Sequence, residues 1–330
     1  MEKQGNEFLE VKNLCVEYTS DKKIVHAVNG ISFTMKKGET LAIVGETGAG
    51  KTTLAKTIMR ILPDPPAKIR EGEVWLDGEN LLEKPEKEMT EIRGKKVAMI
   101  FQDPMTALNP VKTVGSQIVD CYLLHGYSNK DEACKKAKEM LELVGIPVTR
   151  FGEYPFQFSG GMKQRVVIAM ALACNPELIL ADEPTTALDV TIQAQVIGLI
   201  NDLKKQYSAS MILITHDLGV VAQTSDRVIV VYAGTVVEAG ERNDVFLNPS
   251  HPYTKGLFSS LPSMDKKVRR LTPIEGLPAD PTNLPSGCPF HPRCPQSTEK
   301  CRQGQMPVVE LEPGHFCACC NLKHGGTADE

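Results

Sequence analysis

The stretch LAIVGETGAGKTT, residues 41–53, contains the pattern that decides the fold of this chain. An apolar segment with strand character leads into a glycine-rich loop, and the spacing G-x-x-x-x-G-K-[ST] is met by Gly45, Gly50, Lys51 and Thr52. Glycines allow backbone N–H groups to wrap around phosphates, and a helix that starts near Lys51 directs its positive end towards them. The stretch therefore predicts a nucleotide site in which Lys51 reaches the β- and γ-phosphates and the Thr52 hydroxyl binds Mg²⁺.

A second apolar segment, LILADEP at residues 178–184, ends in two adjacent carboxylates. Because side chains alternate along a strand, Asp182 and Glu183 can perform different tasks at its end. Asp182 would hold Mg²⁺, and Glu183 would face the water that attacks the γ-phosphate. Taken alone, the segment could also be an acidic strand end on the surface, but its place after the phosphate-binding pattern favours the catalytic interpretation.

Residues 158–165, FSGGMKQR, predict a second helix start able to bind an anion. Ser159 is a favourable N-cap, and an apolar-rich helix follows. Its first backbone amides would bind an anion, so the chain carries one more phosphate-binding helix start than a monomeric site needs. In this stretch the chain resembles the ATP-binding cassette (ABC) family, whose signature motif it matches except at Phe158 and Met162.

The resemblance covers roughly residues 8–245 and implies roles for further residues. Two subunits of that family pair head-to-tail, so contact with the partner's γ-phosphate is implied for Ser159, Gly160, Gly161 and Met162. The resemblance also implies a role in sensing Mg²⁺ and water for Gln102, a D-loop role for Asp189 in ALD (187–189), a switch role for His216 and adenine stacking for Tyr18. For His216 the alternative is a hydrogen-bonded histidine at the end of a strand. For Tyr18 the alternative is an aromatic residue at a strand exit.

These motifs together define the predicted site. The predicted ATP contacts are Tyr18, Gly45, Glu46, Thr47, Gly48, Ala49, Gly50, Lys51, Thr52 and Thr53. The predicted catalytic residues are Glu183, His216, Lys51 and Gln102, and the predicted Mg²⁺ contacts are Thr52, Gln102 and Asp182. We expect Glu183 to polarise water while Lys51, Mg²⁺ and His216 stabilise the transferring phosphoryl group.

Strands that alternate with helices predict an α/β fold. The resemblance implies a P-loop NTPase ABC cassette with a RecA-like core, an antiparallel β subdomain and a helical subdomain at about residues 103–176. We expect the cassette to span 1–245. Proline density rises beyond Gly240 and argues against regular helices or central strands, so residues 246–330 should form a small, irregular Cys- and Pro-rich C-terminal domain.

Composition and charge restrict the class of protein. The net charge of −4 gives no reason to expect nucleic-acid binding, and the N-terminus lacks the apolar core of a signal peptide. No apolar run approaches the roughly 18 residues that span a bilayer. We therefore expect a cytosolic protein.

Three stretches, FQDPMTALNP, HPYTKGLFSSLP and GCPFHPRCP, resemble the oligopeptide/dipeptide/nickel importer branch of the family. The resemblance is closest to the dipeptide- and oligopeptide-permease ATPase subunits. It implies an ATP-hydrolysing subunit of a dipeptide or oligopeptide importer on the cytoplasmic face of the membrane, with two permease subunits, a second ATPase subunit and an extracytoplasmic binding protein as partners. The alternatives are a nickel importer subunit, a soluble ABC ATPase of translation or DNA repair, and a regulator that binds nucleotide without turnover.

The tail gathers six of the ten cysteines between residues 288 and 320. Disulfides are disfavoured in the cytosol, so the cluster indicates metal chemistry, and four irregularly spaced thiolates suit a [4Fe–4S] cluster better than zinc. Resemblance to the branch's GHxxAC ending gives the predicted ligands Cys288, Cys294, Cys301 and Cys319. Cys317 and Cys320 are alternative candidates for the fourth ligand. A second interpretation is a Zn²⁺ site that includes His291 or His315, and a third is that the cysteines are free thiols in a loop-rich cap.

Overall fold

The computed structural model describes residues 7–20, 23–186, 188–259, 274–304 and 306–322. The chain divides into two compact units. The first unit contains residues 1–35, 41–82 and 216–330, and the second contains residues 36–40 and 83–215. Residues on both sides of position 245 belong to the first unit. The boundary predicted there between the cassette and the C-terminal domain therefore stays a prediction.

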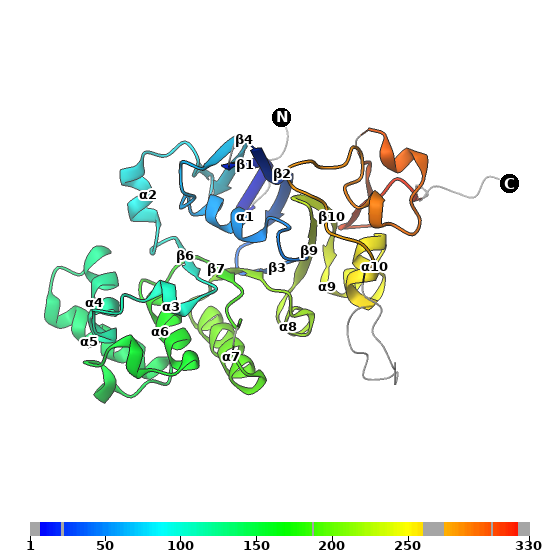
Figure 1. Ribbon diagram of the computed structural model, residues 1–330. Helices are drawn as coiled ribbons and strands as arrows, with labels where there is room; N and C mark the ends of the chain where they lie inside the picture. The colour runs from blue at the N-terminus through cyan, green and yellow to red at the C-terminus, as the bar shows by residue number, and fades with distance from the viewer. Residues whose placement is uncertain (1–6, 21–22, 187, 260–273, 305, 323–330) are drawn as a thin grey trace. The chain divides into compact units, whose positions relative to one another are not determined.

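An antiparallel sheet forms one part of the first unit (Figure 1). Its strand order is β2-β1-β4-β5, with β1 (Leu9–Ser20), β2 (Lys23–Met35), β4 (Ala67–Leu76) and β5 (Glu79–Asn80). The two long strands β1 and β2 pair along their length, as far as Ser20 and Lys23. This sheet is the expected antiparallel β subdomain.

A second set of strands in the first unit carries the phosphate-binding loop. Strand β3 (Thr40–Val44) is buried throughout and pairs in parallel with β9 (Arg227–Tyr232), which pairs in turn with β10 (Thr235–Glu241). A strand buried on both faces needs a continuous apolar run, which is why residues 41–44 do not alternate. Helices α1 (Lys51–Ile58) and α8 (Leu218–Thr224) belong to the same unit.

The C-terminal region is more regular than its proline content predicted. It contains α9 (Arg242–Leu247), α10 (Pro252–Ser259), the 3₁₀ turns at His291–Arg293 and Glu299–Arg302, and the hairpin β11 (Val308–Glu312) and β12 (His315–Ala318). Strand β12 pairs antiparallel with β10, so the hairpin near the red end of the chain continues the sheet beside β10 (Figure 1). The pairing of β12 with β10 escaped sequence reasoning because the two strands lie about 80 residues apart in the chain.

The second unit combines three parallel strands with helices. The strands are β6 (Val97–Ile100), β7 (Leu178–Asp182) and β8 (Ser210–Ile214), in the order β8-β7-β6. The helices are α2 (Glu86–Ile92), α3 (Pro104–Ala107), α4 (Val114–Leu124), α5 (Lys130–Leu143), α6 (Gly160–Leu172) and α7 (Val190–Tyr207), with 3₁₀ turns at Val148–Arg150 and Pro155–Gln157. Helices α4 and α5 are separate because Thr113 and Asn129 each cap a helix start. In the described part of the chain, no helix is long and apolar enough to cross a membrane.

Candidate active site

The glycine-rich loop between β3 and α1 curls around a lysine. Lys51 is 6% exposed, and its Nζ donates to the carbonyl oxygens of Gly45 and Glu46 at 2.8 Å and 2.9 Å. Gly50 has a φ of +97°, and a Cβ there would lie 2.2 Å from the Ala27 carbonyl oxygen. Only glycine fits that position. The loop therefore holds its ammonium group at the start of α1, as the pattern predicted.

Tyr18 lies on β1 close to the same helix start. Its hydroxyl hydrogen-bonds the Thr53 hydroxyl at 3.2 Å, which joins two of the predicted ATP contacts. Tyr18 is partly exposed. The stacking of adenine on this ring stays a prediction.

The two carboxylates at the end of β7 have different environments. Asp182 is 2% exposed, whereas the Glu183 side chain is partly exposed and accepts hydrogen bonds on Oε2 from Gln102 at 2.9 Å and Thr186 at 2.8 Å. Glu183 has a φ of +44°, an unfavourable conformation for glutamate, and its N–H donates to the Ile214 carbonyl. Strained backbone that is held by its neighbours is typical of functional positions.

Gln102 and Glu183 lie 81 residues apart in sequence, and the fold of the second unit brings them into contact. The predicted sensor of Mg²⁺ and water thus contacts the predicted base directly. Thr186 was not among the predicted residues. A hydroxyl three positions after a strand-terminal carboxylate was the sequence feature that could have indicated it.

The signature stretch begins α6 as predicted. The Ser159 side chain caps the helix by accepting from the Met162 N–H, and Gly160 is exposed at the first turn. At Gly161 a Cβ would lie 2.6 Å from the Ile192 side chain, so close packing of α6 against α7 requires this glycine. The helix start therefore presents backbone amides at the surface of the second unit.

The remaining predicted residues occupy helix starts. Asp189 is the N-cap of α7 and accepts from the Ile192 N–H at 3.0 Å, while Ala187 of the predicted D-loop lies outside the described residues. His216 belongs to the first unit and is exposed one residue before Asp217, the N-cap of α8. The roles proposed for Asp189 and His216 in catalysis stay predictions.

Sequence reasoning missed a contact between the tail and the glycine-rich loop. Arg293 forms a bidentate ion pair with Glu46, with Nη1 2.7 Å from Oε2 and Nη2 3.1 Å from Oε1. Burial acts to lower the pKa of Arg293, but hydrogen bonds to Glu46 and Tyr232 outweigh it and raise the pKa, so the guanidinium stays charged. The Glu46 N–H donates to the Tyr253 hydroxyl at 2.9 Å.

The same loop borders a small cavity in the first unit. The cavity, about 170 Å³ in volume, is lined by Glu46–Ala49 of the loop together with Pro278, Ala279 and Pro281 of the tail. The carbonyl of Pro281 accepts from the His26 N–H on β2 at 2.8 Å. The tail thus passes beside the phosphate-binding loop.

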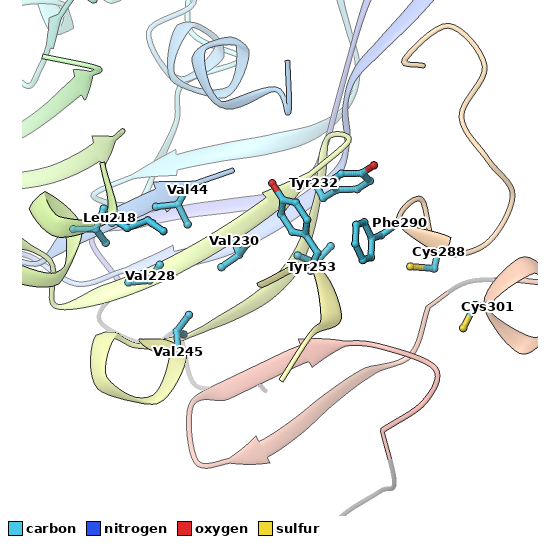
Figure 2. Close-up of a cluster of buried hydrophobic side chains, with 13 residues drawn as sticks. Val44, Leu218, Val228, Val230, Tyr232, Val245, Tyr253, Cys288, Phe290 and Cys301 are labelled. Atoms are coloured by element: carbon cyan, nitrogen blue, oxygen red, sulfur yellow. The ribbon is translucent and has the colours of Figure 1, made fainter. Parts of the chain in front are cut away.

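An aromatic cluster supports this part of the tail (Figure 2). The rings of Tyr232, Tyr253 and Phe290 pack against one another at tilted or edge-on angles, with centroids 4.7 to 5.3 Å apart. Cys288 and Cys301 lie at the edge of the same buried cluster. The tail therefore shares one hydrophobic core with β9 and α10.

The predicted metal ligands converge without forming a ligand set. Burial raises the pKa of the Cys288 thiol to about 11, and the nearby thiols of Cys301, Cys319 and Cys294 act in the same direction. Burial acts to raise the pKa of Cys301, but hydrogen bonds from Thr298 outweigh it and lower the pKa. Among the residues that the structure describes, no group of three or more His, Cys, Asp or Glu side chains is arranged to hold a metal ion.

The two histidines and the cysteine that were alternative metal ligands form contacts with other groups of the protein. His315 Nε2 lies 2.9 Å from the buried Glu238 carboxylate, and His291 Nδ1 lies 3.0 Å from the Cys288 carbonyl oxygen. Cys317 is fully buried, and its burial, together with the Glu238 charge, raises its pKa. The Glu238 contact ties β12 to β10 and gives His315 a structural role.

Comparisons with known proteins agree with this architecture. The family described as "ABC transporter" matches residues 28–186, and that described as "Oligopeptide/dipeptide transporter, C-terminal region" matches residues 237–301. The dipeptide transport ATP-binding protein DppD of Bacillus subtilis (strain 168) is 52% identical over 295 residues, which cover 89% of this chain and 88% of that protein. This chain belongs to the ABC transporter ATPases.

Other relatives of this ABC ATPase extend the likeness across the tail. The oligopeptide transport ATP-binding protein OppD of Salmonella typhimurium is 45% identical over 317 residues, 96% of this chain and 94% of that protein. The dimeric ATP-binding cassette MJ0796, solved with ADP and phosphate, is 30% identical with a TM-score of 0.64 and covers 71% of this chain and 98% of its own. The predicted cassette fold is therefore confirmed.

Proposed function

We propose that this ABC ATPase is the ATP-binding subunit of an importer of dipeptides or oligopeptides. The observation that carries the proposal is the match of both the cassette and the C-terminal region to relatives named for dipeptide and oligopeptide transport. The named relatives cover nearly the whole chain, so the tail is part of the likeness. A nickel importer subunit and a soluble ABC ATPase of translation or DNA repair are the competing functions.

In the proposed mechanism, Lys51 and the loop amides bind the β- and γ-phosphates of ATP. Mg²⁺, held through Thr52, Gln102 and Asp182, would neutralise the developing charge. Glu183 would orient and polarise the attacking water, and its hydrogen bond from Gln102 supports this role because it positions the carboxylate. His216 would stabilise the transferring phosphoryl group.

The assembly is part of the proposal. Two cassettes would close head-to-tail, with the amides of Gly160 and Gly161 on the partner's γ-phosphate. The dimeric structure of MJ0796 supports the pairing of two cassettes. The partners would be a second ATPase subunit, two permease subunits and, through them, an extracytoplasmic binding protein. The chain would act at the cytoplasmic face of the membrane, and closure would move the permeases through the region of Gln102.

A substitution of Glu183 tests the catalytic assignment. Glu183→Gln keeps the hydrogen-bonding shape but removes the charge, so the purified complex should bind ATP and lose about 99% or more of its turnover. Glu142→Gln, exposed at the end of α5, is the matched control and should retain turnover. Hydrolysis at the wild-type rate in Glu183→Gln would refute the assignment.

Transport by the reconstituted complex tests the biological function. Proteoliposomes should accumulate labelled dipeptide or tetrapeptide in an ATP-dependent manner, and should not accumulate Ni²⁺. Co-purification of the tagged chain with membrane permeases supports the proposal. Co-purification with ribosomes or DNA, without permeases, would instead support one of the soluble functions.

We also propose a [4Fe–4S] cluster on Cys288, Cys294, Cys301 and Cys319. The convergence of these thiols supports it, although the described side chains are not arranged as a metal site. Anaerobically purified protein should be brown, absorb near about 400 nm and contain about four irons per chain. Cys294→Ser should remove this iron and Cys134→Ser should not. Stoichiometric zinc would support the alternative metal, and metal-free protein would leave the thiols free.

A further inference from the structure

The strongest unassigned feature is the ion pair between the tail and the phosphate-binding loop. The Arg293 side chain is 5% exposed and that of Glu46 is 25% exposed. The two terminal nitrogens of the guanidinium each donate to a different carboxylate oxygen, Nη1 to Oε2 at 2.7 Å and Nη2 to Oε1 at 3.1 Å. Bidentate pairs of this kind are stronger and more specific in geometry than a single contact. The pair spans 247 residues of sequence, so it exists only because the tail folds back onto β9.

The tail holds the guanidinium in place independently of Glu46. Arg293 Nε donates to the Glu275 carbonyl at 3.0 Å, and Nη2 donates to the Ile274 carbonyl at 3.3 Å. Its guanidinium also lies 5.8 Å from the centre of the Tyr232 ring. These contacts restrict the Arg293 side chain to one conformation without any contribution from Glu46. The positive charge is therefore preorganised on the side of the loop.

Glu46 occupies a position where a carboxylate is electrostatically unfavourable for ATP. It follows Gly45 directly in the loop, and its own carbonyl oxygen accepts from the Lys51 ammonium at 2.9 Å. The loop pattern leaves the residue type at this position open, so glutamate is not required by the fold of the loop. A carboxylate there would repel the triphosphate unless a cation compensated it. Arg293 supplies that cation.

We propose that Arg293 is a positioning residue for nucleotide binding, which neutralises Glu46 and holds it aside so that the phosphate-binding loop accepts ATP. The inference rests on the proposed ATP site. It assigns the C-terminal region a direct part in nucleotide affinity, through charge and not through contact with the ligand. A chain without this arginine would place an uncompensated carboxylate in the loop.

A double-mutant cycle on the full chain tests the proposal. ATP and ADP affinities, in the presence of Mg²⁺, are measured by fluorescence titration for wild type, Arg293→Gln, Glu46→Gln and the double variant. Arg293→Gln should weaken ATP binding about tenfold in the native background and less than about twofold in the Glu46→Gln background. The loss should be smaller for ADP, which carries less charge, and should shrink as salt rises.

A merely structural role makes different predictions. Equal losses for ATP and ADP, or a loss that persists in the Glu46→Gln background, would overturn the proposal. Arg302→Gln, an exposed arginine of the same tail, is the matched control and should leave both affinities unchanged. If Arg293→Gln does not fold, Arg293→Lys replaces it in the test. This variant keeps the charge without the bidentate geometry and should retain most of the ATP affinity. A loss of affinity as large for ADP as for ATP in this variant would overturn the proposal.

Failure of the inference can be told apart from failure of the ATP site. Lys51→Ala should abolish ATP binding if the proposed site is right. If it does so while Arg293→Gln binds ATP as tightly as wild type, only the role of Arg293 is refuted. If Lys51→Ala binds ATP normally, the proposed site itself is refuted.

Discussion

Acid should weaken this fold through one buried histidine. His251 is 1% exposed, and its Nδ1 accepts a hydrogen bond from the Tyr253 N–H at 3.1 Å, which requires an unprotonated ring nitrogen. Burial lowers the pKa of His251 to about 4, and Lys255 acts in the same direction. The Tyr253 hydroxyl in turn accepts from the Glu46 N–H, so His251 lies two residues before a side chain that supports the phosphate-binding loop.

The sign and size of the effect follow from the two pKa values. The folded value of about 4 is below the unfolded value of about 6.5, so the unfolded chain binds a proton first as the pH falls. The stabilisation is present above about pH 6.5 and is lost as the pH falls towards about 4. Each pH unit in this window costs about 1.4 kcal/mol, so the loss from pH 7.5 to pH 5 is about 2 kcal/mol.

Urea unfolding of wild type and His251→Asn at about pH 7.5 and about pH 5 measures this loss. The asparagine oxygen can accept from the Tyr253 N–H but does not titrate, so the variant should lose about 2 kcal/mol less than wild type over the same interval. The other six histidines are common to both proteins and cancel in the comparison. An equal pH-dependent loss in both proteins would refute the reasoning.

Two further predictions concern the loop and the aromatic cluster. Gly50→Ala should abolish ATP binding in a fluorescence titration, because Gly50 has a φ of +97° and its Cβ would lie 2.2 Å from a backbone oxygen, whereas Gly48→Ala, with a φ of +84° and no atom within 4 Å, should lose far less. Phe290→Ala should lower the free energy of unfolding by about 3–5 kcal/mol in urea denaturation, because the ring is 1% exposed, while Phe316→Ala, 37% exposed, should lower it by less than half as much.

Two results would contradict these expectations. Equal ATP affinities for the two glycine variants would show that steric fit at Gly50 does not shape the loop. Equal losses of stability for the two phenylalanine variants would show that the tail does not share the core of β9 and α10.

The sequence by itself determined the features that depend on neighbouring residues. The loop between β3 and α1 and the cap at Ser159 could be predicted because glycine conformation, helix capping and apolar runs act within a few residues of one another. The adjacent Asp182 and Glu183 were found for the same reason, since strand geometry alone places them at the end of β7. The resemblance of these motifs to those of the ABC family then predicted the cassette fold.

Only the tertiary structure decided which distant side chains meet. Gln102 contacts Glu183 across 81 residues, and Arg293 contacts Glu46 across 247. Pairing of β12 with β10, which brings His315 to the Glu238 carboxylate, was equally invisible in a proline-rich tail. Local propensity carries no information about such pairs, because their hydrogen bonds form only when the chain has folded and water is excluded from the contact.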